Sequence, residues 1–312
     1  MIITHFQWIK VQRLTMLFPF WVDMAVPVFM IISGYLYSLS YQKSGYSNLK
    51  QCYSIKASIK RLIRFTIPFF IIFLIEHIIF RFLFNQPSNV ANVIKSFITG
   101  GTGPGSYYYP LLIQFVFIMP LIFFVIKKYD IKGLLVCVAA NFLFEVIKSN
   151  LYISEGVYRL LVFRYITVIA FGCYFAIAKT KLGIGIGCTM MIIGIVYIIV
   201  TQYLAFPPVI MKYWTGTSML ASIYIIPIAS MLLKCEKLRF SPIELIGKAS
   251  YNIFLVQMAY YGIFADWLYA VIENKFLQFV ISLLICVLLG VVFYLVETPL
   301  TKRILKILKL SS

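Results

Sequence analysis

The sequence predicts an all-α integral membrane protein whose helices cross the bilayer many times. Of its 312 residues, 62% are hydrophobic and only 12% are charged, whereas a soluble domain carries about 25% charged residues. Because so few charges cannot cover a water-facing surface, we expect a lipid environment, where only helices or closed barrels satisfy their backbone. The apolar residues form long unbroken runs rather than the alternation of a barrel strand, which favours helices.

Nine apolar runs come close to or exceed the about 20 residues that a spanning helix needs. The fourth run is interrupted near its end by Glu145 and Lys148. Residues 1–8 are apolar but too short to span, and they resemble the back half of a first helix whose front half is missing, which would raise the count to ten. We therefore expect a single transmembrane helical bundle over residues 1–312. The nine runs are Pro19–Leu39, Phe65–Phe84, Tyr107–Ile126, Ile131–Lys148, Leu160–Ala178, Leu182–Phe206, Thr217–Leu233, Ala249–Leu268 and Phe276–Val296.

The basic residues predict how these spans are oriented. Lys and Arg number 28 against 10 acidic residues, for a net charge of +18. Most of them lie in short clusters in alternate loops and in the C-terminal tail, and such clusters mark the cytoplasmic side. We therefore predict a multi-pass protein of the plasma membrane with a cytoplasmic C-terminus. The same pattern argues against nucleic-acid binding, which calls for a clustered basic face. The clusters fall within residues 43–64, 127–132, 179–181, 234–248 and 302–309.

The six cysteines predict neither a disulfide nor a metal site. They form no CxxC pair, and no histidine stands at metal-ligand spacing. Four of them lie inside apolar runs, where a cysteine acts as a small buried apolar residue. We expect no bound cofactor. The first residues also lack the basic segment and cleavage site of a secretory signal peptide.

Ionisable side chains within the spans mark candidate functional sites, because each costs about 2.5–3.5 kcal/mol to insert. His5, in the incomplete first helix, is either a general base that works near neutral pH or a hydrogen-bonded packing histidine. Asp23, at the outer start of the next span, either orients His5 or is solvated at the lipid headgroups. No sequence feature decides between these alternatives by itself.

Other polar residues in the spans are candidates for substrate binding or for structural roles. His77 and Arg81 are four residues apart and share a helix face, and with Glu76 they favour a structural ion pair over a second catalytic base. Gln114 and Glu297 are further polar residues within apolar runs.

Two arginine pairs flank predicted spans. Arg61 and Arg64, at an inner edge, fit either a clamp for an anionic phosphate or the ordinary positive charge of a cytoplasmic loop. Arg159 and Arg164, at an outer edge, either bind a sugar or lipid-linked pyrophosphate or reach to the interface. The outer stretch Gly100–Gly105 (GGTGPG) lacks the strand and lysine of a P-loop, which favours a turn over a phosphate cradle.

Five segments resemble, in order along the chain, motifs of the acyltransferase 3 family of membrane O-acyltransferases. Each is weak alone, but together they cover the whole chain. They are VPVFMIISGY (Val26–Tyr35), RLIRFTIP (Arg61–Pro68), YYPLLIQF (Tyr108–Phe115), SYNIFLVQ (Ser250–Gln257) and ETPLTK (Glu297–Lys302).

The resemblance implies ten helices and transfer of an acyl group, such as acetyl, from cytoplasmic acyl-CoA to a hydroxyl of a surface glycan or lipid-linked sugar. It implies that His5 is the catalytic residue. With His5 in that role, we expect Asp23 to orient it and Arg61 and Arg64 to meet the phosphates of the donor. The family's arginine, eleven residues before the histidine, would fall before Met1, and Gln257 stands where many members have histidine. The expected partners are acyl-CoA, the glycan and membrane lipids. An exporter or flippase of a polysaccharide or lipid-linked sugar, or an inactive family member, is the alternative.

Overall fold

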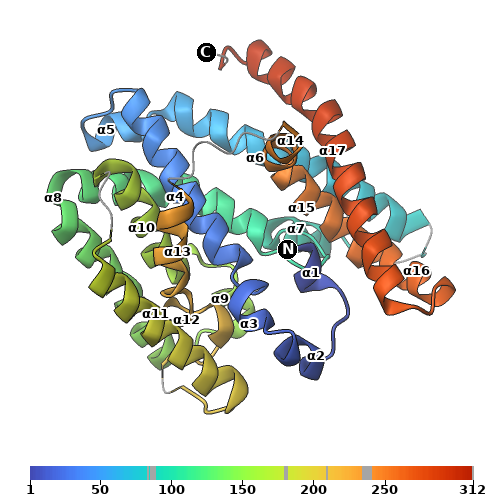
Figure 1. Cartoon of the computed structure of the whole chain (residues 1–312). Coiled ribbons are helices and arrows are strands. Elements are labelled where there is room, and N and C mark those ends of the chain that lie inside the picture. Colours follow the sequence, from blue (N-terminus) through green and yellow to red (C-terminus); the bar gives the residue numbers. More distant parts are fainter. Residues whose placement is uncertain (83, 85–88, 179–181, 209, 234–240, 311–312) are drawn as a thin grey trace. The chain divides into compact units, whose positions relative to one another are not determined.

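The computed structural model is mostly helical over the residues that it describes, which are 1–82, 84, 89–178, 182–208, 210–233 and 241–310. Within these ranges there is no β-strand, and the predicted all-α class is confirmed (Figure 1). Several residues used above to predict orientation, among them Lys179, Lys181, Lys234, Lys237 and Arg239, lie outside the described residues, as does Cys235. The other five cysteines form no disulfide.

Five described helical segments are long and apolar enough to cross a membrane. The segment nearest the C-terminus has 33 residues. At 1.5 Å per residue it is about 50 Å long, which exceeds the thickness of the hydrocarbon core, about 30 Å. The membrane character predicted from composition is therefore confirmed, while the count of nine spans stays a prediction. The five segments are Phe18–Lys43, Leu49–Phe82, Tyr108–Asn150, Ile184–Tyr203 and Lys275–Ile307.

The longest helix, α8 (Tyr108–Asn150), contains two of the predicted spans. At Asp130 its backbone leaves the helical region, with φ 49° and ψ −124°. Just after this break, a Cβ atom on Gly133 would overlap the backbone of Val125, so glycine permits the two arms to fold back closely on each other. The break falls in the predicted loop around Lys127 and Lys132, and each arm of about 20 residues is long enough to span.

Three other predicted spans are built from shorter helical pieces. Residues 160–178 form the 3₁₀ turn η1 (Val162–Tyr165) and α10 (Ile166–Ala178). Residues 217–233 include the end of η3 (Thr215–Thr217), then α12 (Met219–Ser222) and α13 (Ile225–Leu232). Residues 249–268 contain α15 (Ser250–Ala259), the π-helical η4 (Tyr260–Phe264) and the start of α16 (Ala265–Val271).

The helices pack into two compact units, each made of separate stretches of chain. Because the chain passes repeatedly between them, neither is a separate domain in sequence, and the single domain over residues 1–312 stays a prediction. The first unit comprises Met1–Gln7, Ile55–Val116 and Leu238–Ser312, and the second comprises Trp8–Ser54 and Phe117–Lys237.

In the first unit, α15 lies along α17 (Lys275–Ile307), and both contact α6 (Ile55–Phe82) (Figure 1). The short N-terminal helix α1 (Ile2–His5) also packs on α17. Helices α7 (Val90–Thr99) and α14 (Ser241–Lys248), the start of α8, and η4 and α16 also belong to this unit.

In the second unit, α4 (Ala25–Lys43) and α10 form the most extensive helix pair (Figure 1). A Cβ atom on Gly34 would overlap the carbonyl of Ile169, and one on Gly172 would overlap the carbonyl of Ile31. Two small residues thus let the backbones touch, as is common between membrane helices. Besides most of α8 and the pieces η1, η3, α12 and α13, this unit contains α2 (Lys10–Thr15), α3 (Phe18–Trp21), α5 (Leu49–Cys52), α9 (Glu155–Tyr158), α11 (Ile184–Ile198) and the π-helical η2 (Ile199–Tyr203).

Candidate functional site

The polar residues predicted from the sequence fall into both units. His5, Arg61, Arg64, Glu76, His77, Arg81, Gln114 and Glu297 belong to the first unit, and Asp23, Arg159 and Arg164 belong to the second.

His5 ends the short helix α1, which is anchored on both sides of it. Ile2 joins an apolar cluster with Ile253 and Tyr260. Phe6, directly after His5, is buried with its ring edge-on to Tyr269 and Phe279, each at 5.6 Å between ring centres. These contacts fix the backbone around His5 without using its imidazole. The sequence therefore provides a histidine whose position is set by its neighbours.

The glycine loop Gly100–Gly105 lies directly against His5. A Cβ atom on Gly105 would stand 3.1 Å from Nε2 of His5 and 3.0 Å from the ring of Phe254. The φ angles of Gly100, Gly101 and Gly105 are 93°, 102° and 89°, values that favour glycine. This stretch is a turn, as the sequence favoured, but it is closely packed on α15, where a Cβ on Gly103 would overlap the backbone of Met258.

The predicted cluster of Glu76, His77 and Arg81 is divided between different surroundings. Glu76 is 1% exposed and lies beside Thr102 of the glycine loop. Nδ1 of His77 is 3.0 Å from the carbonyl oxygen of Phe73, and its ring packs on the Phe73 ring at 4.0 Å. Arg81 is exposed. Of the three, Glu76 therefore faces the same loop as His5.

Gln257 is a buried amide in α15 that the sequence marked only as a departure from a motif. It is fully buried, and neither its oxygen nor its nitrogen has a hydrogen-bond partner within the described part of the chain. It stands three residues after Phe254, on the helix face that also carries Ile253 and Tyr260. Because Ile253 and Tyr260 pack with Ile2 and Phe254 lies beside Gly105, this face looks toward α1. A buried amide without a partner is rare and calls for a ligand or water.

Two predicted polar residues have structural roles. Glu297 accepts a hydrogen bond from the side-chain amide of Asn252 at 3.3 Å and another from the hydroxyl of Thr301. Glu297 therefore joins α15 to α17, which gives the glutamate and the second threonine of the ETPLTK segment a structural reason. Gln114 donates to the carbonyl oxygen of Pro110 at 3.2 Å, one turn earlier in α8.

Arg61 and Arg64 lie in the basic first part of α6. Arg64 is exposed and Arg61 is half-buried. This exposure suits either contact with a soluble anion or with lipid headgroups, so the donor-binding role stays a prediction.

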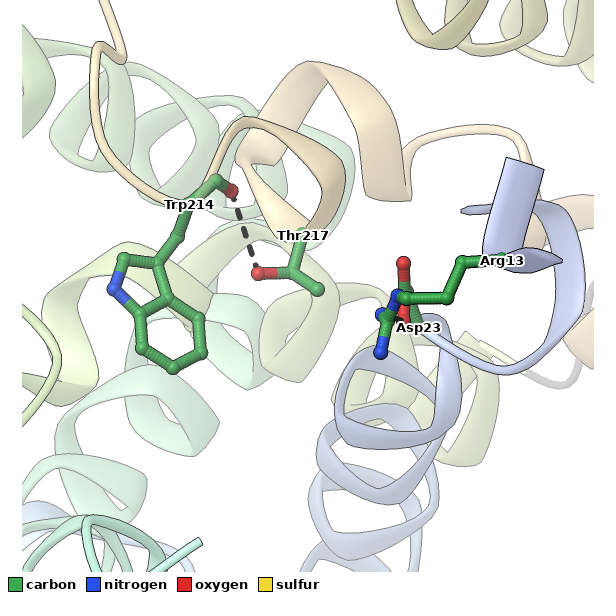
Figure 2. Close-up of polar contacts among 4 residues, drawn as sticks. All are labelled: Arg13, Asp23, Trp214 and Thr217. Atoms are coloured by element: carbon green, nitrogen blue, oxygen red, sulfur yellow. Dashed lines mark hydrogen bonds and ion pairs between the residues drawn. The ribbon is translucent and has the colours of Figure 1, made fainter. Parts of the chain in front are cut away.

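In the second unit, Asp23 pairs with Arg13. One nitrogen of the Arg13 guanidinium lies 2.5 Å from Oδ1 of Asp23 (Figure 2), and the guanidinium carbon is 5.7 Å from the centre of the Phe18 ring. This partner was not predicted from the sequence, although Arg13 precedes Asp23 by only ten residues. The predicted action of Asp23 on His5 stays a prediction.

Arg164 is buried rather than reaching to an interface. It is 1% exposed, donates from Nη2 to the hydroxyl of Thr217 at 2.6 Å, and contacts three aromatic rings. The hydroxyl of Thr217 in turn donates a hydrogen bond to the carbonyl oxygen of Trp214, at 3.4 Å (Figure 2). Arg159 is only half-buried. The rings around Arg164 are those of Tyr158, Tyr165 and Trp214.

Close to Arg164, Tyr158 donates to Oε1 of Glu145 at 2.7 Å. Burial raises the pKa of Tyr158, so its hydroxyl keeps its proton and acts as a donor. In the sequence, Glu145 and Lys148 interrupt a predicted span. Tyr158 follows them closely in the chain, whereas Tyr213, whose ring also contacts Lys148, comes from a distant segment.

Comparison with known proteins identifies the family. The model of the acyltransferase domain family, acyltransferase 3, matches residues 1–295. The chain belongs to the acyltransferase 3 family. No curated protein and no solved structure gave a significant match. Membership of the acyltransferase 3 family, together with the apolar helices, supports a membrane acyltransferase.

Proposed function

We propose that this acyltransferase transfers an acyl group, expected to be acetyl, from cytoplasmic acyl-CoA to a hydroxyl of a surface glycan or lipid-linked sugar. The observation that carries the proposal is the position of His5, whose Nε2 faces the backbone of the glycine loop within the first unit. A base packed against a glycine loop, where the backbone is open to a reacting group, is an arrangement suited to acyl transfer.

In the proposed reaction, Nε2 of His5 removes the proton of the acceptor hydroxyl. The oxygen attacks the thioester carbonyl and forms the new C–O bond. The negative charge on the carbonyl oxygen is stabilised by amides of the glycine loop other than those of Gly100 and Gly101, which donate to Phe97 and Ser96. The C–S bond then breaks, and the imidazolium returns its proton to the CoA thiolate. Glu76 and Gln257, buried beside the loop and α1, would bind the hydroxyls of the sugar.

The purified full chain tests this function. With acetyl-CoA and a glycan acceptor, we expect CoA thiol to be released in proportion to ester formed on the acceptor, as measured by thiol titration and mass spectrometry. Release of thiol without an ester on the acceptor would show that the protein only hydrolyses acetyl-CoA, which would contradict the proposed transfer to a glycan. The absence of both products under conditions where the protein is folded would contradict the proposal.

Arg64 is proposed to bind the phosphates of the donor rather than to act in the chemistry. A hydrogen bond to a charged group contributes about 1.5–3 kcal/mol, so Arg64→Ala is expected to raise the KM for acyl-CoA by roughly ten- to hundredfold with kcat nearly unchanged. Lys302→Ala is the matched control, because Lys302 is an exposed cation on the same predicted side. Equal effects of the two changes would assign Arg64 only a general electrostatic role.

The orientation follows from the same proposal, because the donor is cytoplasmic. The loop that contains Ser47 and the C-terminal tail are expected inside the cell, and the loop that contains Glu273 outside. Both residues are exposed. In intact cells, a cysteine at Ser47 is expected to resist an impermeant thiol reagent and a cysteine at Glu273 to react. The reverse pattern would place the catalytic machinery in the opposite orientation.

A further inference from the structure

The second unit contains a buried group of cations that the proposed reaction does not use. We call Lys148, Arg164 and the rings around them the cationic cluster. Nζ of Lys148 lies 4.5 Å from the centre of the Tyr158 ring and 4.3 Å from that of Tyr213. The guanidinium carbon of Arg164 lies 4.9 Å from the same Tyr158 ring. Both cations therefore pack on the hydroxyphenyl ring of Tyr158.

The donors of this cluster are largely unused. Lys148 is 3% exposed, and its Nζ has no hydrogen-bond acceptor within the described part of the chain. The same holds for Nε and Nη1 of Arg164, whose Nη2 donates to Thr217. Buried charged donors are normally paired and hydrogen-bonded, because a charged group that is removed from water and gains no new partner costs much free energy. Aromatic faces attract a cation but accept none of these hydrogen bonds well.

The nearby carboxylates do not balance the charge. Glu145 is the buried anion of the cluster, and it also accepts the hydroxyl of Tyr158. Two buried cations thus face one buried carboxylate. Farther out, Lys212 and Glu155 both act on Lys148, but they are exposed and offset each other. Among the described residues around the cluster, the buried carboxylate of Glu145 therefore balances only one of the two buried cations.

The loop that contributes the rings of Tyr213 and Trp214 to the cluster is strained at three described positions. Ala205, Met211 and Trp214 have φ angles of 55°, 66° and 54°, in the region that residues with a side chain rarely adopt. The loop is tied down by two hydrogen bonds of 2.6 Å, from Gln202 to Thr215 and from Arg164 to Thr217. Strain that the surroundings hold in place is concentrated at binding and catalytic sites.

We propose that the cationic cluster binds an oxyanion, the phosphoryl group of a phosphate-bearing or phosphate-linked glycan. The phosphates of acyl-CoA are excluded as the ligand because the donor is cytoplasmic. The predicted topology places residues 148–164 and 206–217 at the outer ends of their spans, on the opposite side of the membrane. The unused donors come from a planar guanidinium and a separate ammonium, which suits tetrahedral oxygens better than one planar carboxylate. The choice of a glycan as the phosphate-bearing molecule rests on the proposed acyltransferase function.

Ligand-dependent stability of the purified full chain tests the proposal. Inorganic phosphate and a polyprenyl phosphate are expected to raise the Tm in a saturable way, whereas chloride at equal ionic strength and an uncharged polyprenol are not. Lys148→Met keeps the length of the side chain and removes the charge. It is expected to weaken phosphate binding at least tenfold and to raise the Tm of the ligand-free protein, because an unpaired buried charge is removed. Lys132→Met, at an exposed lysine of the same helix, is expected to change neither quantity.

Several outcomes would overturn the proposal. Equal phosphate binding by wild type and Lys148→Met would remove the cluster from the site, and if that variant fails to fold, Arg164→Lys gives the same comparison. A Tm rise with phosphatidylglycerol vesicles but not with polyprenyl phosphate would indicate a lipid site, and a rise with glucuronate alone would indicate a carboxylate site. Acyl transfer without phosphate binding would remove this inference only, whereas phosphate binding without acyl transfer would remove only the proposed function.

Discussion

Replacement of His5 by alanine is expected to lower acyl transfer by about 10²–10⁴-fold, the usual contribution of a general base. The reason is positional, since His5 is the histidine that faces the glycine loop. Its neighbours Ile2 and Phe6 hold α1 in the apolar core, so the variant is expected to insert and fold normally. Mass spectrometry of the surface glycan measures the acetyl content per sugar, and CoA release measures the rate in vitro.

His77→Ala is the matched control for the loss of a histidine. Nδ1 of His77 is engaged with the carbonyl of Phe73, and its ring stacks within α6, so we expect a much smaller effect. An exporter would give a different result, in which less glycan reaches the surface with an unchanged acetyl content per sugar. Normal acetylation by His5→Ala, in a strain without a second acetyltransferase, would exclude the proposed mechanism.

The sequence predicts the membrane helices well because apolar run length is a local property. Tyr107–Ile126 and Ile131–Lys148 were predicted as separate spans, and the helix α8 breaks between them at Asp130. The basic residues beside that position mark the turn. Where spans are broken into short helices, as in residues 217–233, hydropathy gives no signal, because the composition stays apolar through the break.

The polar contacts of the sites are less predictable, because their partners come from distant segments. Glu297 was predicted as a polar candidate, but its bond to Asn252 depends on α15 lying on α17. The burial of Arg164 depends on a loop more than 45 residues later in the chain. By contrast, the pairing of Asp23 with Arg13 is nearly local, and a search for opposite charges in neighbouring turns would have found it.

The GGTGPG motif of the glycine loop predicts a turn but not the close packing of that turn. A run such as GGTGPG favours a turn, and the backbone confirms one, but packing density is not encoded in the motif. The close approach of Gly101 to Glu76 and of Gly105 to His5 arises only when residues from α1, α6 and α15 assemble around the loop. The contacts of the loop are therefore defined by its surroundings.

The second large effect is expected from Gly105→Ala. The new methyl group would lie 3.1 Å from Nε2 of His5 and 3.0 Å from the ring of Phe254, on a backbone with φ 89°. The loop or the imidazole must therefore shift, and a misplacement of about 1 Å at a reacting group can reduce the rate about 10²-fold. We expect kcat to fall by roughly ten- to hundredfold with little change in the KM for acyl-CoA, because Arg61 and Arg64 are untouched.

Gly45→Ala separates the steric effect from the backbone effect. Gly45 has φ 69°, but no atom lies within 4 Å of the position that a methyl group would take there, so alanine strains the backbone without displacing a neighbour. Both variants are expected to lose about 1–2 kcal/mol of stability, measured as Tm, but only Gly105→Ala should lose turnover. If the two variants keep equal kcat values, the glycine loop does not contact the reacting atoms, and the oxyanion must be stabilised elsewhere.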